Sequence, residues 1–195
     1  YSVPNFIFSH AQKKRENRDD KLFSAIVNDK FPMEGGVSRK FTDIEIVSDS
    51  SLLLFTGNIT TTSLIAFCLY HLAQKPEIFN EVQSNYNLID KVINEVVRLE
   101  APAQATYRVA AQDIEINGIQ IKKGDSIYLP WSAAGRDPQK YADPDKFDIH
   151  RKQGNLSWGK GVHRCLGEKL AKMETRVFLE ETLDRGYATR LAKAM

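Results

Sequence analysis

Apolar residues recur at helical spacing over most of the chain, so helices are the main elements that the sequence predicts. The longest run follows Thr42-Asp43-Ile44-Glu45, where Thr42 can cap a helix and Glu45 can bond back to it. We expect this helix to extend from Asp43 to about Ala73. The other expected helices cover residues 4–17, 19 or 20 to 28, 77–84 with Pro76 in its first turn, 87 or 90 to 99, 131–136, and 167–184 with Gly186 after its end.

The period of the pattern changes to two between residues 106 and 129, which favours β-strands. Asn117-Gly118 is typical of a two-residue hairpin turn, and Lys123-Gly124-Asp125 indicates a second turn. Residues 31–39 and 137–154 are rich in turn-forming residues and are expected to be loops. The expected strands are 106–110, 114–116, 119–121 and 126–129. The predicted fold class is therefore mainly α with small β-sheets.

The long helix carries no formal charge between Asp49 and Lys75, so a membrane span has to be considered. Gly57, Asn58 and several threonines make the stretch too polar for ready insertion. A helix that is apolar all round can instead be buried in the middle of a soluble domain. We expect this second arrangement, and no contact with a membrane.

The size and charge of the chain fit one soluble domain over residues 1–195. Its 195 residues suffice for a core, and its net charge of +2 points to no nucleic-acid partner. Two cysteines do not make a disulfide framework, which favours a reducing, cytoplasmic compartment. Tyr1 begins no signal-peptide pattern, and we expect the start of the chain to be internal.

Cys165 is the main candidate for chemistry. It ends a glycine-rich loop and stands just before a predicted helix, where backbone N–H groups stabilise a thiolate. His163 and Arg164 add positive charge beside it. One thiolate suits a cofactor that brings its other ligands, such as haem. The alternative is a buried structural cysteine. Zinc is disfavoured, because the sequence has no CxxC or HxxxH pair.

The segment from Trp158 to Gly167, Trp-Gly-Lys-Gly-Val-His-Arg-Cys-Leu-Gly, resembles the haem-ligand loop of the cytochrome P-450 family. Trp158 stands where that family usually has Phe. The resemblance implies that Cys165 is the axial ligand of heme b (iron protoporphyrin IX) and that Gly159 and Gly167 shape the loop. It also implies that Trp158 packs against the thiolate, with an N–H able to donate a weak hydrogen bond to it.

Glu95 and Arg98 are three residues apart on one predicted helix and can form an ion pair. A solvent-exposed pair of little energetic weight is one interpretation. An E-x-x-R pair on a helix ahead of the cysteine also resembles the same family. That resemblance implies that Arg151 joins the pair and that all three residues are structural, holding the scaffold of the cysteine loop.

Two further residues have cofactor roles implied by the resemblance. Arg108, on the first strand after the E-x-x-R helix, and His163 are expected to bind haem propionates. The segment Ala134-Gly135-Arg136-Asp137-Pro138 is similar to a segment that is typical of soluble bacterial members.

The middle of the long helix, Thr56-Gly57-Asn58-Ile59-Thr60-Thr61, resembles the family's segment over the distal face of haem. The resemblance implies that Gly57 leaves room for oxygen and that Thr60 guides protonation there. Ile59 occupies the position where the family has an acid, and an isoleucine cannot relay a proton. This departure favours a peroxide-using or non-hydroxylating enzyme as an alternative.

The resemblance covers residues 19–185 and corresponds to the C-terminal part of the family's fold: long central helix, E-x-x-R helix, meander and cysteine-ligand loop. The N-terminal half is expected to be absent, with a second chain or copy as one way to complete the haem pocket. The implied function is oxygen insertion into a C–H bond of a small apolar or natural-product-like molecule. A ferredoxin or flavodoxin-type protein would donate the electrons. A truncated haem-binding or structural module without turnover is the remaining alternative.

Basic residues cluster around the cysteine loop and the last helix. They form either a solvated face or a docking patch for an acidic electron donor, and the sequence leaves both open. The residues are Lys160, Arg164, Lys169, Lys172 and Arg176.

Overall fold

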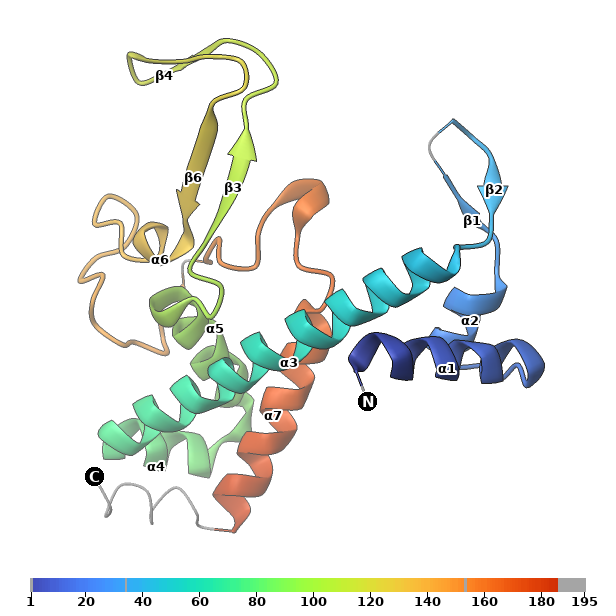
Figure 1. The fold of residues 1–195 in the computed structure, drawn as a ribbon. Coiled ribbons are helices and arrows are strands. Elements are labelled where there is room, and N and C mark those ends of the chain that lie inside the picture. The colour runs from blue at the N-terminus through green and yellow to red at the C-terminus, as the bar shows by residue number, and fades with distance from the viewer. Residues whose placement is uncertain (1, 34, 153, 186–195) are drawn as a thin grey trace. The chain divides into compact units, whose positions relative to one another are not determined.

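A computed structural model describes residues 2–33, 35–152 and 154–185 (Figure 1). The chain divides into two compact units, Tyr1–Ile59 and Thr60–Met195, and the long helix α3 (Asp43–Gln74) belongs to both. The described residues are mainly helical, with three two-stranded sheets. The predicted fold class is confirmed. Gly186, expected to follow the last helix, lies outside the described residues.

The N-terminal unit contains helices α1 (Val3–Glu16) and α2 (Leu22–Asn28), a short hairpin of β1 (Phe31–Pro32) and β2 (Ser38–Arg39), and the first part of α3. Two local predictions for it are wrong. Neither Asp19 nor Asp20 caps α2, since its N-cap is Lys21; the Asp19 carboxylate accepts from the Lys21 backbone N–H instead. The expected loop over 31–39 holds the antiparallel pair β1–β2. The core of the unit consists of Ile7, Ala11, Val27 and Ile46.

The start of α3 has the predicted capping box. The Glu45 backbone N–H donates to the Thr42 hydroxyl at 3.3 Å, and the Glu45 carboxylate accepts from the Thr42 backbone N–H at 2.8 Å. Arg39 adds a bidentate pair to the same carboxylate, at 2.7 and 2.8 Å. The bonds from Arg39 and then from Thr42 hold the pKa of Glu45 well below its ordinary value.

The lowered pKa predicts a pH-dependent start of α3. A carboxyl group whose pKa is lower in the folded state favours folding above its ordinary pKa, and this contribution is lost as the pH falls through the lowered value. We expect the Glu45 carboxyl carbon, followed by NMR, to titrate well below the ordinary range of a glutamate side chain. We also expect Glu45→Gln to remove part of the acid-induced loss of stability. An ordinary titration midpoint for Glu45 would contradict the capping geometry.

The expectation that α3 is buried on all sides is wrong. Only 17% of its most apolar 18-residue window is buried, and Leu52, Phe55 and Ile59 are exposed. The buried residues of α3 lie towards its two ends. Ile46 belongs to the core of the N-terminal unit, and residues 64, 68 and 72 belong to the core of the C-terminal unit. Among the described residues, α3 is the one helix that is long and apolar enough to cross a membrane, judged by length and composition alone.

The core of the C-terminal unit forms around α5 (Ile89–Glu100), which α4 (Pro76–Ser84), the end of α3 and α7 (Glu168–Asp184) surround (Figure 1). Neither Asn87 nor Asp90 caps α5. A 3-10 turn, η1 (Tyr86–Leu88), leads directly into the helix, and the Asn85 side chain accepts from the Asn87 backbone N–H. The apolar stripe predicted for this helix is buried: Leu88, Val92, Ile93, Val96 and Leu99.

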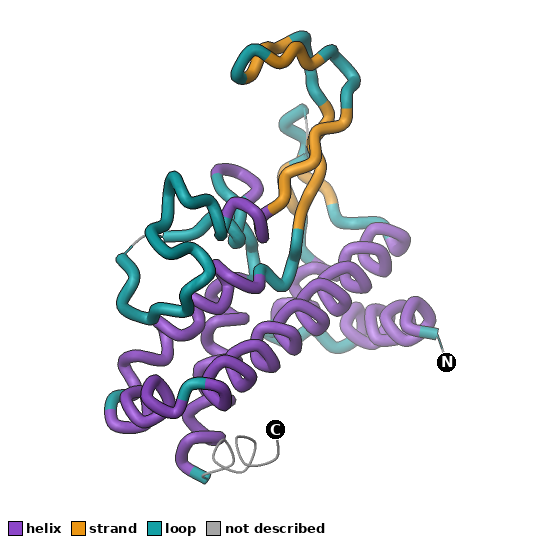
Figure 2. The backbone as a smooth tube through the Cα atoms, turned by 90° about the vertical axis from the view of Figure 1, so that its left-hand side faces the viewer, coloured by secondary structure: helices purple, strands orange, loops and turns teal. Residues whose placement is uncertain are grey.

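The strands follow α5 and form a ribbon of two antiparallel pairs (Figure 2). β3 (Ala105–Val109) pairs with β6 (Ser126–Pro130), and β4 (Ile114–Ile116) pairs with β5 (Ile119–Ile121). The turn at Asn117 and Gly118 has the positive φ angles, 49° and 80°, that its sequence predicts. Helix α6 (Trp131–Ala134) ends the ribbon, and a long irregular segment leads to the 3-10 turn η2 (Gly161–His163) before α7.

Candidate cysteine-ligand site

The loop that carries Cys165 is closed by its own backbone. The Cys165 N–H donates to the Trp158 carbonyl at 2.7 Å, and the Gly159 N–H donates to the Leu156 carbonyl at 2.8 Å. Gly159 and Gly161 have positive φ angles of 73° and 65°, which favour glycine. Cys165 is exposed and stands three residues before the first residue of α7. The loop therefore presents one thiol at the start of a helix.

The two cysteines of the chain have opposite environments. Cys68, on α3, is fully buried, and burial raises the pKa of its thiol. A buried thiol of this kind stays protonated and behaves as a small apolar side chain. Cys165 is exposed. Of the two, only Cys165 is open to an external ligand.

Replacement of Gly159 by alanine is expected to destabilise the loop. A Cβ at this position would lie 2.8 Å from the His163 carbonyl oxygen, and the φ angle of 73° strains any other residue. A non-glycine residue in this region costs about 1 to 3 kcal/mol. Urea unfolding followed by circular dichroism measures the loss. Gly154→Ala is the matched control, because among the described residues no atom beyond its chain neighbours lies within 4 Å of the added Cβ. Equal effects of the two changes would contradict the loop geometry.

Behind the loop, Glu95 and Arg98 of α5 form a buried, bidentate ion pair. Arg98 Nε donates to Glu95 Oε2 at 2.8 Å, and Arg98 Nη2 donates to Glu95 Oε1 at 2.7 Å. Arg151 Nε reaches the same Oε1 at 3.3 Å, and the Asp148 backbone N–H donates to it at 2.9 Å. The side chains of Glu95 and Arg98 are only 4% and 1% exposed. The structure thus brings together the three residues predicted to form this cluster, which we call the Glu95 cluster.

Arg98 also binds the segment that follows α6, which the sequence did not predict. Its remaining N–H groups donate to three backbone carbonyls, those of Gly135 and Pro144 at 2.6 Å and of Lys146 at 3.1 Å. Tyr141 lies under the guanidinium, with the Arg98 Cζ 5.1 Å from the centroid of its ring. The Tyr141 hydroxyl donates to the Gly154 carbonyl at 2.8 Å. Every residue has a backbone carbonyl, so the sequence could not indicate these three acceptors. Tyr141, an aromatic residue among turn-forming residues, is a weak sequence signal for a buried contact.

Helix α5, which carries Glu95 and Arg98, contacts the cysteine loop and the residues just before it. The Asn155 side-chain amide donates to the Asn94 carbonyl of α5 at 3.2 Å. Trp158 packs against the core of the unit. Lys172 Nζ lies over the Trp158 ring, 5.4 Å from its centroid. The indole N–H of Trp158 is buried and has no hydrogen-bond partner among the described residues. The loop is thereby tethered to α5 on one side and to α7 on the other.

The remaining predicted site residues lie on β3, η2 and α3 and at the N-cap of α7, which is Gly167. Arg108, on β3, is half-buried, and its Nη1 donates to the Tyr107 carbonyl at 2.8 Å. His163 ends η2 and is exposed. Gly57 and Thr60 lie about one turn apart on α3, with Gly57 in the N-terminal unit and Thr60 in the C-terminal one. Open space surrounds the position of a Cβ on Gly57 and on Gly167.

Ion pairs occupy part of the basic cluster around α7. Arg164 and Lys172 both bind the Glu168 carboxylate, at 2.8 Å each. Burial alone would raise the pKa of Glu168, but the hydrogen bonds from Lys172 and Arg164 hold it below its ordinary value. Arg176 pairs with Asp90 and Glu180. Lys160 and Lys169 take part in no ion pair within the described ranges.

The surroundings of Cys165 fit a flat, apolar cofactor that is held by one thiolate. Val162 and Leu166, on either side of it in the sequence, are 96% and 90% exposed. The indole N–H of Trp158 is an unpaired donor in the same loop. In the part of the chain that the structure describes, no group of three or more His, Cys, Asp or Glu side chains lies close enough to hold a metal ion. A porphyrin supplies its own four nitrogen ligands and needs no such group.

Comparison with known proteins identifies the family. The model of the family described as Cytochrome P450 matches residues 3–185. The chain belongs to the cytochrome P450 family. The family resemblance stated on the cysteine loop and the E-x-x-R pair is therefore confirmed, and so is the fold class that it implied.

Several cytochromes P450 are similar to the chain over nearly its whole length. The biotin biosynthesis cytochrome P450 of Bacillus subtilis is 36% identical over 182 residues, which cover 93% of this chain and 45% of that protein. The 6-deoxyerythronolide B hydroxylase of Saccharopolyspora erythraea is 33% identical, with 94% and 45% covered. The chain thus spans about 45% of the length of these two relatives.

The fold agrees with solved cytochrome P450 structures. The structure of P450BioI in complex with hexadec-9Z-enoic acid ligated acyl carrier protein matches with a TM-score of 0.85 at 34% identity. The match covers 94% of this chain and 46% of that one.

Proposed function

We propose that the chain provides the cysteine-ligand half of a haem-thiolate monooxygenase, which inserts oxygen into a C–H bond of a small, largely apolar molecule. The observation that carries this proposal is the exposed Cys165, held by its backbone bond to Trp158 at the start of α7. Membership of the cytochrome P450 family supports it. The long acyl chain named with P450BioI, and the hydroxylase among the relatives, support an apolar substrate.

In this proposal each residue of the chain has one role. Cys165 binds the iron of heme b, which when bound supplies a redox-active metal whose thiolate ligand donates electron density. Arg108 and His163 hold the propionates by charge-assisted hydrogen bonds. The Glu95 cluster keeps the cysteine loop in place. Thr60 would supply a hydroxyl donor beside the bound group, and Gly57, which has no side chain, would leave room for oxygen there.

The proposal extends to location and partners. We infer a soluble, cytoplasmic protein, because polar residues interrupt the apolar run of α3 and the start of this helix carries charged side chains. A ferredoxin or flavodoxin-type donor would dock near Lys160 and Lys169, whose charges face no acidic partner among the described residues. Reduction by such a donor should slow as ionic strength rises. A reduction rate that does not change with ionic strength would contradict this docking site.

A difference spectrum of the reduced, carbon monoxide-treated chain tests the central proposal. After reconstitution with haem, an absorption maximum at about 450 nm is expected, because only a thiolate ligand gives that signature. Absence of bound haem would contradict the proposal and favour a scaffold module without turnover. The measurement needs neither the substrate nor the electron donor.

A peroxide-using enzyme is a second candidate, and Ile59 favours it. This residue occupies the acid position of the distal segment, and its side chain is 60% exposed and unable to carry a proton. An enzyme of this kind would turn over with hydrogen peroxide and without a reductase. We expect Ile59→Glu to shift turnover from peroxide towards the electron donor. If the unchanged chain turns over normally with the electron donor and gives no product with hydrogen peroxide, this candidate is excluded.

A further inference from the structure

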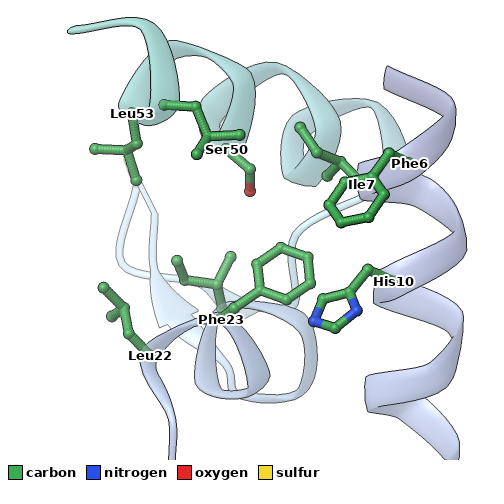
Figure 3. Close-up of a pocket in the computed structure, with 9 residues that line it drawn as sticks. Phe6, Ile7, His10, Leu22, Phe23, Ser50 and Leu53 are labelled. Atoms are coloured by element: carbon green, nitrogen blue, oxygen red, sulfur yellow. The ribbon is translucent and has the colours of Figure 1, made fainter. Parts of the chain in front are cut away.

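The N-terminal unit contains a cavity of about 340 Å³, which none of the residues of the proposed haem site lines. Three helices form its walls, and several of the side chains remain exposed, so the cavity opens to solvent (Figure 3). A volume in this range fits a compact organic ligand. The lining residues are Phe6, Ile7 and His10 of α1, Leu22, Phe23 and Ile26 of α2, and Ser50, Leu53 and Leu54 of α3.

One polar group of the cavity wall is unsatisfied. The Ser50 side chain is buried, with 8% of the residue exposed, and its hydroxyl has no hydrogen-bond partner among the described residues. Figure 3 shows this hydroxyl directed into the cavity. A buried polar group without a partner costs about 1 to 3 kcal/mol. A bound molecule with a hydrogen-bonding atom at this point would remove that cost.

An aromatic wall faces the same space. The His10 ring lies between the rings of Phe6 and Phe23, with centroid distances of 6.0 and 5.3 Å and interplanar angles of 3° and 22°. Stacking fixes the orientation of these rings and gives the cavity a rigid apolar side. No lysine, arginine or carboxylate is among its described lining residues. His10 is the one titratable side chain among them. A charged ligand would lose its hydration without a permanently charged partner, so the cavity selects against it above the pH at which His10 is protonated.

We propose that this cavity binds a compact, neutral, largely apolar molecule with one hydroxyl group, which pairs with Ser50. The body of the molecule lies against Phe6, Phe23 and Leu53. The cavity shares no lining residue with the proposed haem site, and the inference does not depend on haem binding.

Three matched probes test the proposal on the full 195-residue chain by isothermal titration calorimetry. They are 2-naphthol, naphthalene and 2-naphthoate, which share one ring system and differ in a neutral hydroxyl, no polar group and a charge. We expect 2-naphthol to bind about fivefold more tightly than naphthalene, as one hydrogen bond provides. We expect 2-naphthoate to bind more weakly than either. Equal affinities for all three would overturn the proposal.

Two pairs of variants locate the binding site. Ser50→Ala should weaken 2-naphthol about fivefold and leave naphthalene unchanged. Its control is Ser51→Ala, because the Ser51 hydroxyl is also buried and unpaired but does not line the cavity. Leu53→Trp should fill the cavity and abolish binding of both probes, whereas Leu52→Trp, at an exposed neighbour outside the cavity, should not.

Other occupants of the cavity give different results. If a second copy of the chain fills it, sedimentation velocity will show self-association that Leu53→Trp removes, and 2-naphthol will not bind to the dimer. That result, or an affinity for 2-naphthol that neither Ser50→Ala nor Leu53→Trp changes, would overturn the proposal. Circular dichroism of each variant establishes that the helices are retained.

Discussion

Replacement of Arg98 by methionine is expected to lower the free energy of unfolding by about 3 to 5 kcal/mol, the usual cost of removing one partner from a buried ion pair. Glu95 would keep only the longer contact with Arg151 Nε, at 3.3 Å, and the Asp148 N–H. The five N–H groups of Arg98 are all used, two on Glu95 and three on the carbonyls of Gly135, Pro144 and Lys146. Urea unfolding followed by circular dichroism measures the effect. A loss of this size is a large part of the stability of an ordinary domain.

A conservative variant and an exposed pair serve as controls. Arg98→Lys keeps the charge but offers three donors instead of five, so it should remain strongly destabilising. Lys122→Met removes an ion pair with Asp113 whose side chains are 66% and 59% exposed, and it should cost less than about 1 kcal/mol. Similar losses for Arg98→Met and Lys122→Met would contradict the buried arrangement.

The double variant Glu95→Leu with Arg98→Met separates the Glu95–Arg98 ion pair from the other contacts of the two residues. Replacing a whole buried ion pair by apolar residues is often neutral. Here the three carbonyls that Arg98 satisfies would stay unpaired, and Arg151 Nε and the Asp148 N–H would lose their acceptor on Glu95, so we expect the double variant to recover little stability. Full recovery would mean that neither the carbonyl contacts of Arg98 nor the bonds of Arg151 and Asp148 to Glu95 contribute to stability.

Replacement of Cys165 by serine is expected to abolish the absorption band at about 450 nm in the reduced, carbon monoxide-treated chain. A serine hydroxyl is not ionised at neutral pH and cannot replace a thiolate. The folded structure should be retained, because the Cys165 side chain is exposed and the loop is held through backbone atoms. Circular dichroism of the variant checks this second expectation.

Cys68→Ala is the matched control for this change. Cys68 is buried in the core of the C-terminal unit, so its removal affects packing and leaves the band in place. A band that survives Cys165→Ser and disappears with Cys68→Ala would overturn the assignment of the ligand.

Local signals in the sequence predicted most elements, because their causes lie within a few residues. The capping box at Thr42 and the turn at Asn117 are examples, since neighbouring side chains and backbone angles determine both. The start of α2 at Leu22 was mispredicted, as the nearby aspartate that resembles a cap bonds to the loop instead. An aspartate near a helix start can accept a hydrogen bond from the helix or from the preceding loop, and the sequence does not distinguish the two.

The features that depend on distant partners were harder to predict. The residue types and their order indicated the Glu95 cluster, but the backbone carbonyls that bind Arg98 lie 37 to 48 residues away in the sequence. The exposure of the middle of α3 was not predictable from its composition, because burial depends on which other elements pack against it. The cavity around Ser50 gave no signal, since a serine on a helix is common.

The contrast between the two cysteines makes the chain suitable for selective chemical labelling. The sequence contains two thiols, and the structure buries Cys68 while it exposes Cys165. A maleimide dye applied to the folded chain should therefore attach at one position, in the loop before α7. Denaturation should double the number of dyes per chain. The rate of attachment would then report directly on whether a bound molecule covers the cysteine loop.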